Sequence, residues 1–68
     1  MDVLLFKKGK AIGFEIKYTD SPTITKSIRI ALEDLNLHHL YVVYPGDETF
    51  HLSESITAVS VTNLNFAV

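Results

Sequence analysis

Two apolar, β-prone runs, residues 2–6 and 11–18, flank the short cationic sequence Lys7-Lys8-Gly9-Lys10. Glycine adopts a positive φ without steric cost, so the pattern predicts a β-hairpin whose two-residue loop is Lys8-Gly9. Side chains alternate between the two faces of a strand, and a change of one residue in the pairing would exchange those faces. The turn therefore determines which residues share a face.

The two faces of this hairpin differ in character. With this loop, Val3 lies opposite Phe14 and Asp2 lies opposite Glu15. One face then holds Asp2, Leu4, Phe6, Ala11, Gly13, Glu15 and Lys17. The other holds Val3, Leu5, Ile12, Phe14, Ile16 and Tyr18. We expect the second face to be continuous core, and the first to be apolar near the turn and ionisable at its far end.

An amphipathic helix is predicted after the hairpin. Pro22 lacks a backbone donor and disfavours helix in the preceding residue, so the sequence Asp20-Ser21-Pro22 ends the second strand. Apolar residues then recur at intervals of three and four, as on one face of a helix: Ile24, Ile28, Ala31, Leu32 and Leu35. Thr25 is the expected N-cap, and Asn36 suits a left-handed position at the C-terminal end.

The remaining elements are short strands. Residues 40–44 form an apolar run that predicts a buried strand, and Pro45-Gly46-Asp47 predicts the turn that ends it. Residues 49–52 suit a brief strand, and residues 56–61 alternate as in a strand with one exposed face. The expected fold is a single small α+β domain over residues 1–68, with a β-hairpin, one amphipathic helix and two or three further short strands.

The chain is short and apolar for a domain that stands alone. It has 68 residues, no cysteine and 47% hydrophobic residues, so neither disulfides nor thiolate metal sites can stabilise it. The apolar excess predicts a homo-oligomer or a covering segment supplied from elsewhere. No run reaches the ~20 apolar residues of a membrane span, and no signal peptide is recognisable, so we expect a cytoplasmic protein without membrane contact.

The charge is divided along the sequence. All six cations fall in the first 30 residues with three acids, which gives +3, and the remaining five acids give the rest -5. Lys7, Lys8 and Lys10 suit non-specific contacts with a nucleic-acid backbone, and Lys26 and Arg29 suit a phosphate at the helix N-terminus. The alternative for all five is an ordinary solvated surface. The three histidines, His38, His39 and His51, are expected to be polar structural residues rather than metal ligands.

Glu15-Ile16-Lys17 is the tripeptide with the clearest chemical potential. Glu15 and Lys17 project from one strand face, and Asp2 joins them across the hairpin. Two neighbouring carboxylates suit a hard ion such as Mg²⁺, while the ammonium group can position water or stabilise charge on a phosphate. The set suits phosphodiester hydrolysis, and the alternative is a salt-bridged surface.

Four stretches together resemble one known family: GFEIKYTDSP (13–22), TKS (25–27), ALEDL (31–35) and LYVVYPG (40–46). They are similar to the C-terminal region of prokaryotic AAA-type P-loop ATPases that end in a domain of unknown function, whose tail resembles the PD-(D/E)xK restriction-endonuclease-like fold. The resemblance covers roughly residues 1–62. It implies that Asp2 is the motif's Asp, Glu15 its second acid and Lys17 its lysine, with Mg²⁺ held by Asp2 and Glu15.

The sequence also departs from that family. No G-x-x-x-x-G-K-[ST] motif occurs, so no ATP site is predicted. The first helix and strand of a nuclease-like core are missing, as is an acid two places before Asp2, so we expect a C-terminal fragment of a larger architecture, inactive alone.

Two functions follow as hypotheses. The favoured one is a non-catalytic module that dimerises or binds a partner ATPase. The alternative is a Mg²⁺-dependent nuclease in which Asp2, Glu15 and Lys17 are catalytic and Lys26 and Arg29 bind phosphate.

Overall fold

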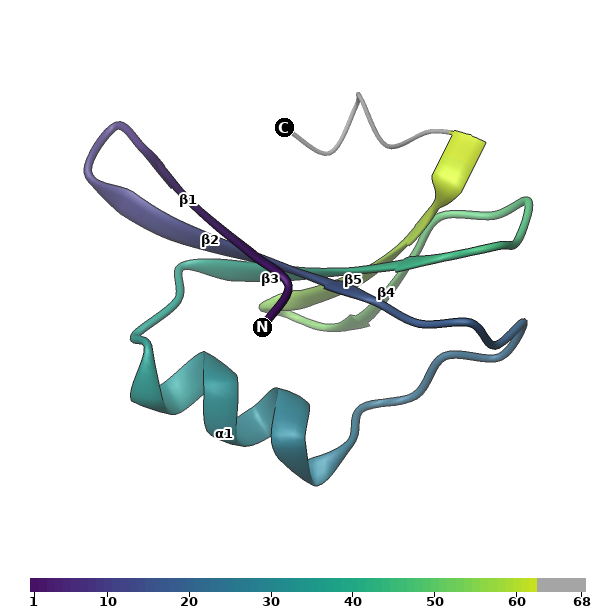
Figure 1. Ribbon diagram of the computed structural model, residues 1–68, viewed down its shortest axis with the longest axis horizontal. Helices are drawn as coiled ribbons and strands as arrows, with labels where there is room; N and C mark the ends of the chain where they lie inside the picture. The colour runs from purple at the N-terminus through teal and green to yellow at the C-terminus, as the bar shows by residue number, and fades with distance from the viewer. Residues whose placement is uncertain (63–68) are drawn as a thin grey trace.

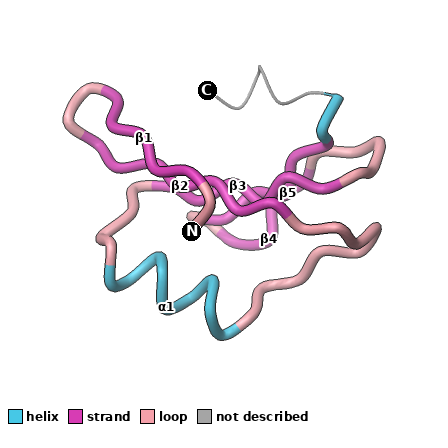
Figure 2. The backbone as a smooth tube through the Cα atoms, in the orientation of Figure 1, coloured by secondary structure: helices cyan, strands magenta, loops and turns pink. Residues whose placement is uncertain are grey.

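The computed structural model describes residues 1–62 as a five-stranded mixed sheet with one helix across one face (Figure 1). The elements are β1 (Val3–Lys7), β2 (Lys10–Ile16), α1 (Lys26–Asp34), β3 (His39–Tyr44), β4 (Phe50–Ser53) and β5 (Ile56–Ser60). Figure 2 shows the long loop that leads from β2 to α1 and the short one that returns to β3. The predicted α+β class is confirmed.

The hairpin has the predicted loop and register. Lys8 and Gly9 both have positive φ, 53° and 77°, as the favoured two-residue hairpin turn requires. Val3 pairs with Phe14, and Lys7 pairs with Lys10 beside the loop. The turn chemistry therefore fixes the face of every hairpin residue.

The sheet has the strand order β1-β2-β3-β5-β4. The inner strands β2, β3 and β5 are parallel, and the outer strands β1 and β4 pair antiparallel with their neighbours. The chain passes from β2 through α1 to the parallel strand β3, because parallel neighbours need a crossover connection. The two edge strands of the sheet differ in their pairing. Strand β4 has a register shift between His51 and Ser53, whereas β1 pairs with its neighbour without interruption.

Helix α1 has the predicted cap and, apart from Leu35, the predicted apolar face. The Ile28 N–H donates to the Thr25 hydroxyl at 3.2 Å, and Asn36 follows the helix with φ 50°. Leu35 was expected on the buried face and is instead 42% exposed. Leu37, which is 8% exposed, enters the core in its place because the left-handed turn at Asn36 redirects the chain toward the sheet.

The core lies on the opposite sheet face from the one predicted. It consists of Ile28, Leu37, Leu40, Val42 and Ile56, with Ala11, Ile24, Ala31, Leu32 and Leu52 packed against it. Gly13 admits this packing, because a Cβ there would lie 2.8 Å from Leu37 Cδ1. Of the face expected to be continuous core, Phe14 is buried and Ile12 is half-buried. The others are exposed: Val3, Leu5, Ile16 and Tyr18.

Strand β5 also differs from its prediction. The alternating sequence favoured one exposed face, but all five residues of β5 are buried. The reason is its position, because β5 lies between β3 and β4 inside the sheet. Its small polar side chains, Thr57 and Ser60, are buried with hydrogen-bond partners rather than solvated.

Candidate functional site

At the far end of the β1–β2 hairpin, Glu15 and Lys17 form an ion pair, and Asp2 bonds to the backbone of the intervening Ile16. Asp2 lies directly before β1, and its Oδ2 accepts a hydrogen bond of 2.7 Å from the Ile16 N–H. Glu15 Oε2 lies 3.6 Å from Lys17 Nζ, and Glu15 Oε1 lies 3.7 Å from the terminal ammonium of Met1. The register of the hairpin is sufficient to explain this grouping.

These contacts decide what the group can do chemically. Mg²⁺ prefers oxygen ligands and is commonly held through one or two carboxylates and several waters. Here both carboxylate oxygens of Glu15 lie near cationic groups. One carboxylate oxygen of Asp2 accepts a hydrogen bond from the Ile16 backbone N–H, at the end of the hairpin. Within residues 1–62 no group of three or more His, Cys, Asp or Glu side chains could hold a metal ion. As arranged, the three residues fit an ion-paired strand end and do not fit a Mg²⁺ site, so a magnesium site stays a prediction.

Lys26 and Arg29 lie apart from this group in their interactions. Both are exposed in the first turns of α1, where no acidic residue is present. In the described part of the chain, neither forms an ion pair with Asp2 or Glu15. Their phosphate-binding role also stays a prediction.

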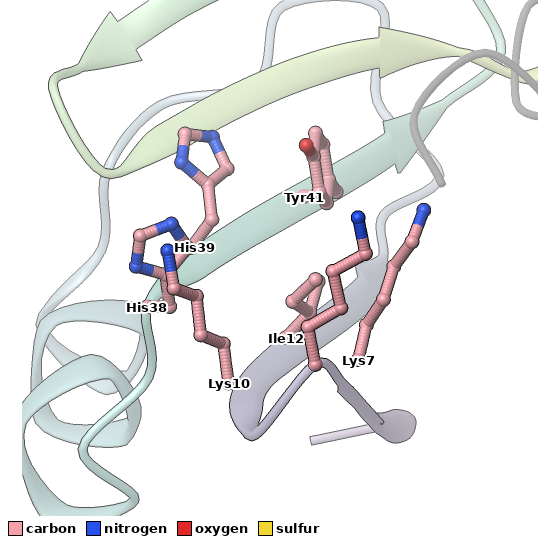
Figure 3. Close-up of a pocket in the computed structure, with 7 residues that line it drawn as sticks. Lys7, Lys10, Ile12, His38, His39 and Tyr41 are labelled. Atoms are coloured by element: carbon pink, nitrogen blue, oxygen red, sulfur yellow. The ribbon is translucent and has the colours of Figure 1, made fainter.

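A cationic cavity of about 280 Å³ opens at the other end of the hairpin, on the sheet face opposite α1 (Figure 3). Its lining residues are Lys7, Lys8, Lys10, Ile12, His38, His39 and Tyr41. Lys7 and Lys10 are directly paired across the strands, and Ile12 is the parallel partner of His39. In Figure 3, Lys7 and Lys10 extend toward the side of the sheet where His39 and Tyr41 stand.

Aromatic and imidazole rings form one wall of this cavity. Tyr41 stacks on the buried Phe14 with ring centroids 5.3 Å apart, and its ring lies 4.7 Å from that of His39. His39 Nε2 and His51 Nδ1 lie 2.7 Å and 3.0 Å from the single hydroxyl of Thr57. Burial lowers the pKa of His39, and the neighbouring His51 and His38 act in the same direction. A neutral imidazole is therefore favoured at this position.

The sequence alone did not reveal this cavity. It placed His39 among the structural polar residues, because adjacent histidines on a strand point to opposite faces. The missing information is the parallel pairing of β2 with β3, which sets His39 beside Ile12 and Tyr41 beside Phe14. The recognisable signal was the cross-strand pair of like charges, Lys7 and Lys10.

The outer edge of β1 is the third notable surface. All five residues of β1 are exposed, and Phe6 is 74% exposed. An edge strand presents unpaired backbone groups that can pair with another chain. The opposite edge, β4, is shorter and interrupted by its register shift, which blunts it.

Comparison with known proteins identifies the family of this chain. Residues 1–64 match a domain of unknown function, DUF4143. The chain belongs to the DUF4143 family. An uncharacterized protein of Mycobacterium tuberculosis and one of Mycobacterium bovis are each 46% identical to the DUF4143 chain over 59 residues. No solved structure matches the chain significantly.

The DUF4143 chain corresponds to a small part of these relatives. The matched region is 87% of this chain and 13% of the length of each relative. Among the residues that the structure describes, no helix is long and apolar enough to cross a membrane, since α1 has only nine residues.

Proposed function

We propose that this DUF4143 chain is a non-catalytic interaction module that pairs with a second copy of itself through the outer edge of β1. The observation that carries the proposal is the uninterrupted, exposed and largely uncharged edge that β1 presents. The apolar excess of the sequence points the same way, because a second copy would cover side chains that the fold leaves exposed.

The hydrogen bonds of β2 determine which β1 groups face outward. The Ile16 N–H points toward the β1 side, where Asp2 accepts it, and the Lys17 N–H donates to Val43 O of β3. Because these directions alternate along a strand, the even-numbered residues of β2 bond to β1. Their partners Val3, Leu5 and Lys7 use their backbone groups inside the hairpin. The N–H and C=O groups of Leu4 and Phe6 therefore face away from the sheet.

One antiparallel register satisfies these outward groups with two-fold symmetry. Centring the pair on Leu5 sets Leu4 of one copy opposite Phe6 of the other, and both residues can then exchange backbone hydrogen bonds. The same register sets Asp2 opposite Lys8 of the second copy, so the ends of the paired strands carry opposite charges. Lys7 meets Val3 rather than another cation.

The expected complex is weak. Five residues per strand bury less area than the ~1,600 Å² of a standard stable interface, so we expect a dissociation constant of about micromolar or larger. The resemblance to ATPase tails offers a partner ATPase as the competing occupant of this edge. A chain that stays monomeric at all concentrations would favour that competitor over a second copy.

Sedimentation velocity over a concentration series tests the proposal. We expect reversible dimerisation of the 68-residue chain, abolished by Leu4→Pro. Proline removes only an outward N–H at this position and is tolerated on edge strands, so circular dichroism should show an unchanged fold.

A matched pair of aromatic substitutions provides the control. Phe6→Ser and Tyr18→Ser each remove one exposed ring, since Phe6 is 74% and Tyr18 93% exposed. We expect Phe6→Ser to weaken the dimer and Tyr18→Ser to leave it unchanged. Equal effects of the two would mean that general apolar surface, not the β1 edge, drives association.

A further inference from the structure

We propose that the cationic cavity at the β1–β2 turn binds single-stranded nucleic acid without sequence preference, with Lys8 and Lys10 on the phosphates and Tyr41 against a base. The proposal concerns the face of the sheet opposite α1 and is independent of pairing at the β1 edge. Its grounds are the charge of the cavity, the support of its aromatic wall and its size.

The charge of the cavity is concentrated and of one sign. Lys7 and Lys10 are opposed across the antiparallel pair, and Lys8 lies in the loop between them. Lys8 and Lys10 both line the cavity, so an anion bound there is attracted by at least these two positive charges. None of the described residues that line the cavity is acidic. A phosphate backbone supplies anions at the spacing that a row of lysines can follow.

The aromatic wall of the cavity is supported by packing against the sheet. Tyr41 lies nearly parallel to Phe14, with an interplanar angle of 23°, and Phe14 is itself buried. The His39 ring lies 4.7 Å from the Tyr41 ring, and His39 Nε2 is hydrogen-bonded to the Thr57 hydroxyl. Proteins that bind single strands combine a cationic groove with aromatic rings on which bases stack, and every base offers such a face.

The size of the cavity favours a strand over a free small ligand. Its volume of about 280 Å³ lies just below the ~300–1,000 Å³ that pockets enclosing small molecules occupy. It can accommodate part of a nucleotide while the rest of the strand continues along the surface. A mononucleotide would leave most of its own surface in water and bind weakly.

Fluorescence anisotropy with a labelled oligothymidylate tests the proposal. We expect saturable binding at low salt, and a logarithm of the association constant that falls linearly with the logarithm of salt concentration. The double variant Lys8→Gln/Lys10→Gln should bind about fivefold or more weakly. Its salt slope should be smaller by about 1.4, because each phosphate contact to a single strand contributes ~0.7. Thymidine monophosphate should compete only at much higher concentration than the unlabelled strand.

The control variant is Lys26→Gln/Arg29→Gln, which removes the same charge from α1. We expect it to bind the strand nearly as tightly as the original chain. Tyr41→Leu should weaken binding without changing the salt slope, while Tyr41→Phe keeps the ring and should bind normally; circular dichroism checks that each variant folds. No binding at low salt would overturn the proposal. So would equal weakening by the two double variants, or a mononucleotide that competes as well as the strand.

Discussion

At the scale of single residues, Thr57 organises the open face of the sheet. Its one hydroxyl proton can be donated to only one of the two imidazoles, so the other ring must donate an N–H to the same oxygen. This arrangement is complete only while at least one of His39 and His51 is neutral. The protonation state of His39 is therefore coupled to the packing of β3, β4 and β5.

Acid should destabilise the fold through His39. Its pKa is lowered in the folded state, so below the usual value of 6.5 the unfolded chain binds more protons. The contribution to stability is intact above pH 6.5 and is lost as pH falls from there through the folded pKa. Among the described residues, the groups around His39 are cationic or neutral: His38, His51, Lys7, Lys10 and Tyr41.

Urea unfolding between neutral and mildly acidic pH measures this effect. We expect the free energy of unfolding of the original chain to fall across this range, and His39→Gln to reduce the dependence. An unchanged pH dependence in His39→Gln would assign the effect to other groups.

A second prediction concerns the core at the end of α1, where Leu37 is buried and Leu35 is exposed. Leu37→Ala should cost about 2–5 kcal/mol, because it leaves a cavity beside Gly13 and α1. Leu35→Ala should cost much less, because Leu35 is 42% exposed. A domain of this size has only ~3–5 kcal/mol in total, so Leu37→Ala should be largely unfolded at room temperature. Equal midpoints of thermal unfolding for the two variants would contradict the described core.

The ion-paired strand end gives a third prediction. Because cations already face both oxygens of Glu15, we expect millimolar Mg²⁺ to leave the NMR amide signals of Asp2, Glu15 and Lys17 in place. Saturable shifts that disappear in Glu15→Gln, with metal-dependent DNA cleavage that Lys17→Ala abolishes, would instead support the nuclease hypothesis.

At the scale of elements, the features that depend on neighbouring residues in the sequence were predictable from the sequence alone. The Lys8-Gly9 turn, the Thr25 cap and the left-handed Asn36 each depend on a few neighbouring residues, and all three are confirmed. The covered face of the hairpin and the burial of β5 depend on long-range pairing, and both predictions were wrong. The position of Asp2 beside the end of β2 followed from the turn. The histidine and tyrosine wall, by contrast, depends on the β2–β3 register.

Helix α1 should depend strongly on its cap. It has nine residues and no acid in its first turn, so little else satisfies or complements its N-terminal N–H groups. Thr25→Ala should destabilise the domain by about 1 kcal/mol, and Thr25→Ser should retain most of the stability. Urea midpoints of the two variants provide the comparison, and equal midpoints would show that the cap contributes nothing.

At the scale of the whole molecule, three surfaces have separate properties. The far end of the hairpin is ion-paired, the turn end forms a cationic cavity, and the outer edge of β1 is apolar. Of these three surfaces, as the described residues 1–62 form them, the β1 edge is the one that also leaves backbone hydrogen-bonding groups open along a regular strand. This combination is the reason why we propose association, rather than catalysis, as the function of this domain.

Amide hydrogen exchange along β1 tests this central claim most directly. In a monomer the outward N–H groups of Leu4 and Phe6 meet solvent, whereas the Leu5 N–H is bonded within the hairpin. We predict that protection of Leu4 and Phe6 rises with protein concentration while that of Leu5 stays constant. Protection of Leu4 and Phe6 that does not change with concentration would contradict pairing through β1.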